Sequence, residues 1–148
     1  MNTANSTTLN SALDSTGAAG TSYSWIGSAG DLLGRLGLAT IFLLAGISKI
    51  QGYEATAGYM SSVGIPAALL PAVIGLEIVG ALLLIVGFQT RLAALALAGF
   101  SVSSALLFHF NLADQMQFIL FFKNIAMAGG FLLLATHGAG AWSIDAKR

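Results

Sequence analysis

Four long apolar runs separated by short polar segments dominate the sequence. The hydrocarbon core of a bilayer is about 30 Å thick, and a helix needs roughly 20 apolar residues to cross it. None of the runs alternates with period two, as the strands of an outer-membrane barrel do, so each run predicts a membrane-spanning helix. The expected spans, by approximate residue number, are 31–50, 67–88, 92–110 and 118–136.

The segments between these runs predict how the helices are connected. Residues 51–65 are too polar to cross a membrane, and we expect a loop there with a short interfacial helix over 55–60. Tight turns are expected at 89–91 and 111–115. Because short loops make consecutive helices antiparallel neighbours, residues 31–148 predict an all-α, integral membrane four-helix bundle with up-down-up-down topology.

The first 30 residues differ in character from the rest of the chain. They are rich in Ser, Thr, Asn, Ala and Gly, and their first charged residue is Asp14. They lack the basic and apolar regions of a secretory signal. Such a segment cannot bury enough apolar area to offset its ordering entropy, so residues 1–30 predict a flexible polar N-terminal tail. Alternatively, Tyr23, Trp25 and Ile26 lie in the membrane interface.

The basic residues predict an orientation in the membrane. If both termini lie on one side, that side collects Arg35, Arg91, Lys147 and Arg148. The opposite side has only Lys49 and Lys123, both near helix ends. Cytoplasmic segments of membrane proteins carry an excess of Lys and Arg, so both termini are expected in the cytoplasm. Trp142, beyond the last span, is expected as an interfacial anchor.

Composition narrows the class of protein. Of the 148 residues 56% are apolar and only 8% are charged, whereas a soluble domain carries about 25% charged residues. The chain is therefore expected to be a multi-pass integral membrane protein, with the lipid bilayer as its main partner. Its formal net charge is zero and it has no cysteine. A nucleic-acid partner, disulfides, thiol catalysis and thiolate metal sites are thus not expected.

One carboxylate, Glu77, lies near the middle of the second span. An ionised side chain at that depth costs about 2.5–3.5 kcal/mol or more on insertion scales, so it needs a partner or a task. Under the predicted orientation, Lys49, His109 and Lys123 lie toward the outer ends of three other helices. If they face inward, Glu77 can pair with Lys49 or Lys123, and His109 and Asn124 can add hydrogen bonds. Alternatively, the lysines extend outward and Glu77 is protonated.

No motif of a self-contained enzyme is present. The two histidines lie in different spans, and the few carboxylates do not have metal-ligand spacing, so no metal site is expected. A glycine-rich nucleotide loop and a nucleophile elbow are also absent from the sequence. We expect neither a catalytic residue nor a cofactor of the chain's own.

The ordered set of motifs resembles the DoxX family of small bacterial membrane proteins. The resemblance rests on GRLGLATIFLLAGISKI, the Gly64-Ile65-Pro66 turn, EIVGALLLIVGFQTR, Lys123-Asn124 and GAGAWSID. It covers about residues 31–145 and implies a four-helix inner-membrane protein with cytoplasmic termini. The polar positions typical of the family are, by this resemblance, Arg35, Lys49, Glu77, Arg91, Lys123, Asn124 and Asp145.

Three functions follow as hypotheses. Some members of the family are subunits of a thiosulfate:quinone oxidoreductase and others are linked to redox-stress complexes. This implies an accessory subunit of a larger membrane oxidoreductase complex, in which quinone is the cofactor and the polar cluster lines its site. The second hypothesis is a small homo-oligomeric transporter or proton-conducting bundle that uses Glu77 as a relay. The third is a structural membrane interaction protein that contributes no chemistry.

Overall fold

The computed structural model describes the backbone of residues 4–148 and the side chains of residues 25–148. The described residues form helices and no strand. The elements are, in chain order, α1 (Ala4–Gln51), α2 (Tyr53–Ser62), the 3-10 helix η1 (Ala67–Leu69), α3 (Leu70–Val86), α4 (Thr90–Phe108), α5 (Gln115–His137) and the 3-10 helix η2 (Asp145–Lys147).

Four helical segments are long and apolar enough to cross a membrane, which confirms the number of spans. They are Trp25–Gln51, Ala67–Val86, Thr90–Phe108 and Gln115–His137. The third span begins and ends two residues earlier than the sequence predicts. The second ends two residues early because Gly87 adopts a left-handed conformation, with φ of 69°, that caps α3. The short helix expected over 55–60 is present as α2, and its interfacial position stays a prediction.

Trp25 is the first residue whose side chain the structure describes, so the predicted beginning of the first span at residue 31 stays a prediction. Residues 25–30, expected in the polar tail, continue as helix into the first apolar segment. Trp25 and Ile26 supply apolar surface there, with exposed fractions of 60% and 56%. Residues 1–3, and the side chains of residues 4–24, lie outside the described part of the chain. The flexibility of the tail stays a prediction.

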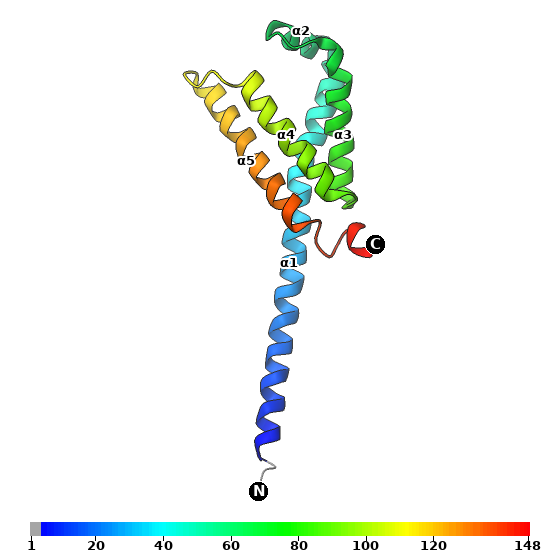
Figure 1. Cartoon of the computed structure of the whole chain (residues 1–148), viewed down its shortest axis with the longest axis vertical. Helices are drawn as coiled ribbons and strands as arrows, with labels where there is room; N and C mark the ends of the chain where they lie inside the picture. The colour runs from blue at the N-terminus through cyan, green and yellow to red at the C-terminus, as the bar shows by residue number, and fades with distance from the viewer. Residues whose placement is uncertain (1–3) are drawn as a thin grey trace.

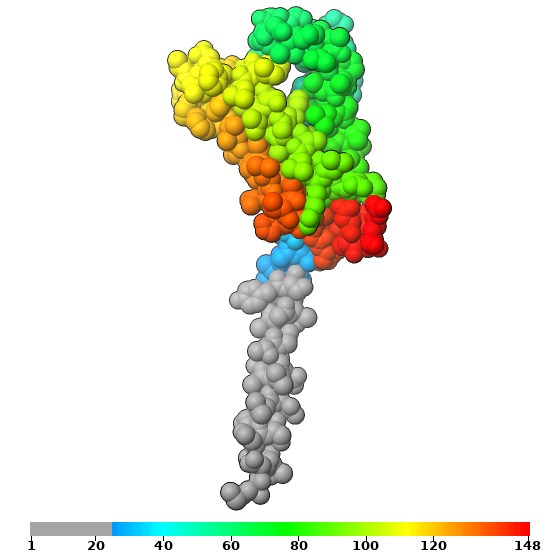
Figure 2. Space-filling view, viewed as in Figure 1, coloured from blue at the N-terminus to red at the C-terminus, as the bar shows by residue number. Residues whose placement is uncertain are grey.

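The helices pack as two pairs. α1 packs mainly on α3, α4 packs mainly on α5, and α3 joins the pairs by packing on α4. Figure 1 shows the pairs close together near the C-terminal segment and diverging toward α2 and the α4–α5 connection. Figure 2 shows a hollow between α2 and this connection. The fold is therefore closed at one end and open at the other.

The core lies where the two pairs meet. Phe42 of α1 contacts Phe131 of α5 edge to face, with ring centroids 5.3 Å apart. Small residues allow the backbones to approach closely. A Cβ on Gly46 would lie 2.6 Å from Cγ1 of Ile78, so α1 and α3 touch directly at that position. The buried apolar core consists of Ala39, Phe42, Ala81, Leu84, Ala93, Ala94, Leu97, Ala98 and Phe131.

Arg35 joins α1 to the C-terminal segment, which we define as residues 138–148. Its side chain is only 2% exposed. Nη1 donates a hydrogen bond to the carbonyl of Ala139, and Nη2 donates to the carbonyl of Trp142 at 2.8 Å. The sequence predicts Arg35 as an orientation determinant, and that role stays a prediction; the structure adds its hydrogen bonds to the C-terminal segment. The guanidinium satisfies loop carbonyls because those groups have no helical partner.

Asp145 fastens the same segment to the beginning of α4. Its two carboxylate oxygens accept hydrogen bonds from the backbone N–H groups of Gln89 and Thr90, both at 2.9 Å. Its own N–H donates to the carbonyl of Gly87 at 2.8 Å. Partial burial of the carboxylate acts to raise its pKa, but the hydrogen bonds from Thr90 and Gln89 and the nearby Arg148 lower the pKa of Asp145 below the ordinary value.

We expect Gly87→Ala to loosen the C-terminal segment. A Cβ at this position would lie 2.4 Å from Cβ of Ser143, and the positive φ strains any L side chain. The expected loss is about 1–3 kcal/mol, measured as thermal unfolding in detergent. Gly99→Ala is the matched control, because a Cβ on Gly99 meets nothing within 4 Å. Equal melting temperatures for the two variants would contradict the close contact.

We also expect attachment of the C-terminal segment to depend on pH. Because the folded pKa of Asp145 is lowered, its contribution is complete above the unfolded value of about 3.9 and is lost as the pH falls through the folded value. Amide hydrogen exchange at Gln89 and Thr90, corrected for the intrinsic rate, should therefore accelerate below about pH 4. Asp145→Ala should weaken the cap by about 0.5–2 kcal/mol at pH 6 and flatten this response. Unchanged protection of the Gln89 and Thr90 amides from exchange in the wild type at pH 3 would contradict their hydrogen bonds to the Asp145 carboxylate.

Candidate functional site

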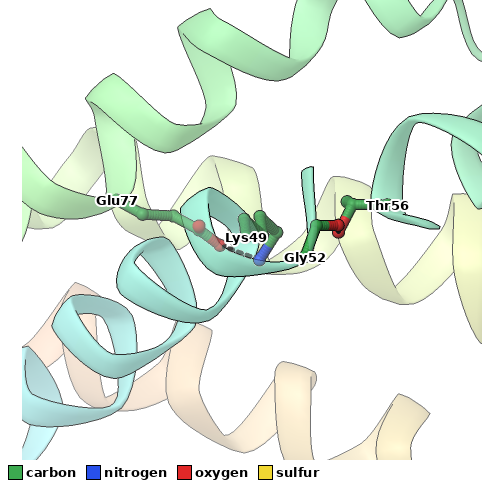
Figure 3. Close-up of polar contacts among 4 residues, drawn as sticks. All are labelled: Lys49, Gly52, Thr56 and Glu77. Carbon is green, nitrogen blue, oxygen red and sulfur yellow. Dashed lines mark hydrogen bonds and ion pairs between the residues drawn. The ribbon is translucent and has the colours of Figure 1, made fainter. Parts of the chain in front are cut away.

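An ion pair lies inside the open half of the fold. Lys49, in the last turn of α1, extends its Nζ to within 2.8 Å of Glu77 Oε1 on α3 (Figure 3). The Glu77 side chain is 3% exposed and that of Lys49 is 26% exposed. Pairing compensates for part of the cost of burying the carboxylate. This confirms one of the two pairings that the sequence allows.

The second carboxylate oxygen of Glu77 has no partner within the described part of the chain. Oε2 is buried and accepts no hydrogen bond from any residue that the structure describes. The nearby Thr56 hydroxyl donates instead to the carbonyl of Gly52 at 2.9 Å, as Figure 3 shows. A buried acceptor without a donor costs about 1–3 kcal/mol. A ligand or water that carries an O–H or N–H group would therefore be favoured at Oε2.

A cavity of about 340 Å³ lies on one side of the ion pair, enclosed by residues of α1, η1, α2, α3 and α4. Its walls are mainly apolar and aromatic. The rings of Tyr59 and Phe108 lie 5.6 Å apart at its rim, and the Tyr59 hydroxyl donates to the carbonyl of Phe108. Leu69 and Leu107 also line it and are half exposed, so the rim reaches the outer surface of the bundle.

A smaller cavity of about 150 Å³ lies between α1, α3, α4 and α5. All five residues of the predicted polar cluster line it: Lys49, Glu77, His109, Lys123 and Asn124. The structure thus brings the five together at one cavity. Lys49, Glu77, Phe100, Ser104 and His109 line both cavities, so the ion pair lies at their common wall. A binding role for these residues stays a prediction.

The other three members of the cluster differ in their partners. His109, at the C-terminal cap of α4, shares a hydrogen bond of 2.8 Å between Nδ1 and Gln117 Oε1. Asn124 is buried and donates from Nδ2 to the carbonyl of Leu120 at 2.8 Å. Lys123 is exposed, and no hydrogen bond or ion pair joins it to the described residues. The site therefore combines an acceptor, two ammonium donors and an imidazole.

Several residues of the site were not predicted from sequence. Ser104, Phe100 and Met127 line the smaller cavity, and Thr56 and Tyr59 line the larger one. The serine is a polar residue inside an apolar span, which is a signal that could have identified it. Phe100 and Met127 have no such signal, because apolar residues occur on every face of a membrane helix.

The remaining predicted residues lie at the opposite end of the bundle. Arg91 is exposed in the first turn of α4, and Trp142 is half exposed in the C-terminal segment. Neither lies near the Lys49–Glu77 pair. Among the residues with described side chains, no group of three His, Cys, Asp or Glu side chains is arranged to hold a metal ion.

Comparisons with known proteins identify similar sequences. The chain is 47% identical to inner membrane protein YqjF of Escherichia coli (strain K12) over 116 residues, which covers 78% of this chain and 89% of that protein. It is 35% identical to inner membrane protein YphA of the same organism over 123 residues, covering 78% and 88%. A protein of Bacillus subtilis (strain 168) named "Putative oxidoreductase CatD" is 30% identical over 103 residues, covering 67% and 77%.

No solved structure matches the chain. The similarity to two inner-membrane proteins and the four apolar spans place the chain in the bacterial inner membrane as a multi-pass protein. The DoxX family profile matches residues 30–110, more than half of the sequence and including Lys49 and Glu77. The chain belongs to the DoxX family.

Proposed function

We propose that the chain is a membrane subunit of an oxidoreductase complex and that the cavities beside Lys49 and Glu77 receive a quinone or quinol. The observation that carries this proposal is Glu77 Oε2, a buried acceptor with no donor among the described residues, at the wall of an apolar cavity. The similarity to a protein named as an oxidoreductase supports the same class of function.

The residues present suit a quinone. Small-molecule sites typically occupy about 300–1,000 Å³ and combine apolar walls with a few polar groups. The larger cavity, of about 340 Å³, has that character. Its aromatic rim at Tyr59 and Phe108 can pack on a flat ring, and the half-exposed Leu69 and Leu107 allow an apolar tail to extend into lipid.

A bound quinol supplies two electrons and two protons when it is oxidised. In our proposal, Glu77 Oε2 accepts the proton of a hydroxyl group, and Lys49 stabilises the carboxylate before that transfer. Lys49 also has N–H groups left to donate, because an ammonium carries three. His109 lines the same cavity and, with Nδ1 donating to Gln117 Oε1, can accept the second proton at Nε2. We assign the redox centre that exchanges the electrons to a partner protein.

We also propose an up-down-up-down arrangement across the membrane, with both termini in the cytoplasm. Arg91, Lys147 and Arg148 belong to the end of the bundle opposite α2, where the C-terminal segment lies (Figure 1). The excess of basic residues at that end favours a cytoplasmic location. The Lys49–Glu77 pair then lies in the outer half of the bilayer, and α2 lies at the outer surface.

A second candidate function has support from the two cavities. Because Glu77 and His109 line both of them, a proton could pass between the cavities through the carboxylate in a homo-oligomeric conducting bundle. Proteoliposomes distinguish the candidates. Proton flux that requires Glu77 and no added quinone would favour conduction, and its absence would favour the subunit of an oxidoreductase complex.

We expect Glu77→Gln to weaken quinol binding by about tenfold to a hundredfold, because it removes a charge-assisted hydrogen bond. The measurement is a titration of purified protein with a short-chain quinol in detergent. Glu54→Gln is the matched control, since Glu54 is an exposed acid of α2 that lines neither cavity. Equal affinities for wild type and Glu77→Gln would contradict the assigned acceptor.

A double-mutant cycle at Lys49 and Glu77 separates their effect on quinol binding from their effect on protein stability. Lys49→Met should destabilise the protein by about 1–3 kcal/mol, because it leaves a buried carboxylate unpaired while Lys49 itself is partly solvated. The apolar pair Lys49→Met with Glu77→Leu should recover most of that loss. The function we propose requires this stable double variant to lose quinol binding. A double variant that binds quinol and assembles like wild type would leave the pair a purely structural role.

A further inference from the structure

A third cavity, at the opposite end of the bundle, has a different chemical character. It has a volume of about 710 Å³ and lies between the α3–α4 turn, the end of α5 and the C-terminal segment. Arg91, His137 and Arg148 come from these three parts of the chain and line it together. No part of the quinol site contributes to this cavity. The cavity therefore needs an explanation of its own.

The guanidinium of Arg91 is available to a ligand. A Cβ placed on Gly138 would lie 3.6 Å from Arg91 Nε and 3.7 Å from Nη2, so this guanidinium lies against the cap of α5. No hydrogen bond or ion pair joins Arg91 to another residue within the described part of the chain. Arg148 lies over the Phe88 ring, with Cζ 5.2 Å from the centroid. Two arginines thus approach one hollow from different elements.

The side chains that line the cavity carry an excess of positive charge, because Arg91 and Arg148 face one acidic side chain. That side chain is Asp145, and both of its oxygens already accept the N–H groups of Gln89 and Thr90. Nδ1 of His137 donates to the carbonyl of Leu133, which leaves Nε2 for other contacts. The fully buried Thr90 also lines the cavity, with its side chain beside the Asp145 carboxylate.

An apolar stripe continues from Arg91 along α4. Leu95 follows Arg91 by four residues, Val102 follows Leu95 by seven, and Leu106 follows Val102 by four, so these side chains share one helix face. Their exposed fractions are 53%, 39% and 51%. A molecule with an anionic head at Arg91 and an acyl chain along this face would match both the charge of the cavity and the surface beside it.

We propose that this cavity is a binding site for the phosphate of an anionic phospholipid. Arginine binds phosphate through two parallel N–H donors, and basic pockets at the cytoplasmic ends of membrane helices bind anionic head groups. Arg91 provides the main phosphate contact, Arg148 provides the second charge, and the acyl chain lies along Leu95 and Val102. The bound lipid bridges α4, α5 and the C-terminal segment. A soluble phosphate has the same head-group chemistry but no acyl chain to contact the apolar stripe.

The test is native mass spectrometry of the full-length protein from mixed detergent micelles that contain phosphatidylglycerol and phosphatidylcholine in equal amounts. Wild type should retain the anionic lipid preferentially. Arg91→Gln should lower that retention about fivefold to tenfold, and Arg148→Gln should lower it less. Lys147→Gln is the matched control, because Lys147 directly precedes Arg148 at the end of η2 but lies outside this cavity. It should change retention less than twofold.

Each other outcome overturns the proposal. Equal losses in Arg91→Gln and Lys147→Gln would show a general charge effect, and no loss in either would show that the arginines do not bind lipid. Glycerol phosphate distinguishes the two sources of phosphate. If it binds wild type in an Arg91-dependent manner while lipid retention does not depend on Arg91, the ligand is a soluble phosphate. Arg148 is exposed beyond η2, so its variant tests the site even if Arg91→Gln does not fold.

Discussion

A carboxylate buried in a bilayer must be paired, and the Lys49–Glu77 pair shows how this chain meets that requirement. The contact of 2.8 Å joins the last turn of α1 to α3, beside the position where Gly46 lets those two helices touch. Only one of the two carboxylate oxygens is used. A pair that served packing alone would be more stable with both oxygens satisfied, because each buried acceptor without a donor costs free energy. The partial pairing is what motivates the proposed ligand site.

The two ends of the bundle differ in how tightly their helices are held together. At the end with the C-terminal segment, Arg35 and Asp145 bind backbone groups of loops and a helix beginning, so they hold α1, α4 and that segment together. At the other end, α1 with α3 and α4 with α5 diverge (Figure 1), and cavities remain between them. Because the closed end fixes how the pairs meet, the open end can keep a cavity without losing the fold.

Sequence alone predicts the four spans from their length and apolar composition. It also predicts that Glu77 needs a partner, because a single charge in an apolar run is a strong signal. It could not choose between Lys49 and Lys123 as the partner, since each residue turns a helix by about 100° and the rotation of each helix is set by packing. It also could not find the roles of Arg35 and Asp145. Their partners are backbone groups of Ala139, Trp142, Gln89 and Thr90, and a backbone carbonyl or N–H has no signature in the sequence.

The resemblance treats Arg35, Lys49, Glu77 and Asp145 as one set of typical polar positions, but their surroundings divide them. Arg35 and Asp145 make their hydrogen bonds to backbone atoms of the protein itself. Their substitution should therefore lower the free energy of unfolding. Glu77 has an oxygen free beside a cavity, so its conservative replacement by Gln should act on binding before it acts on folding. Lys49 should act on both stability and binding, because it neutralises Glu77 and its ammonium still has N–H groups to donate. The chemistry of the protein is therefore best sought at the open end, where a buried charge is stabilised but not saturated.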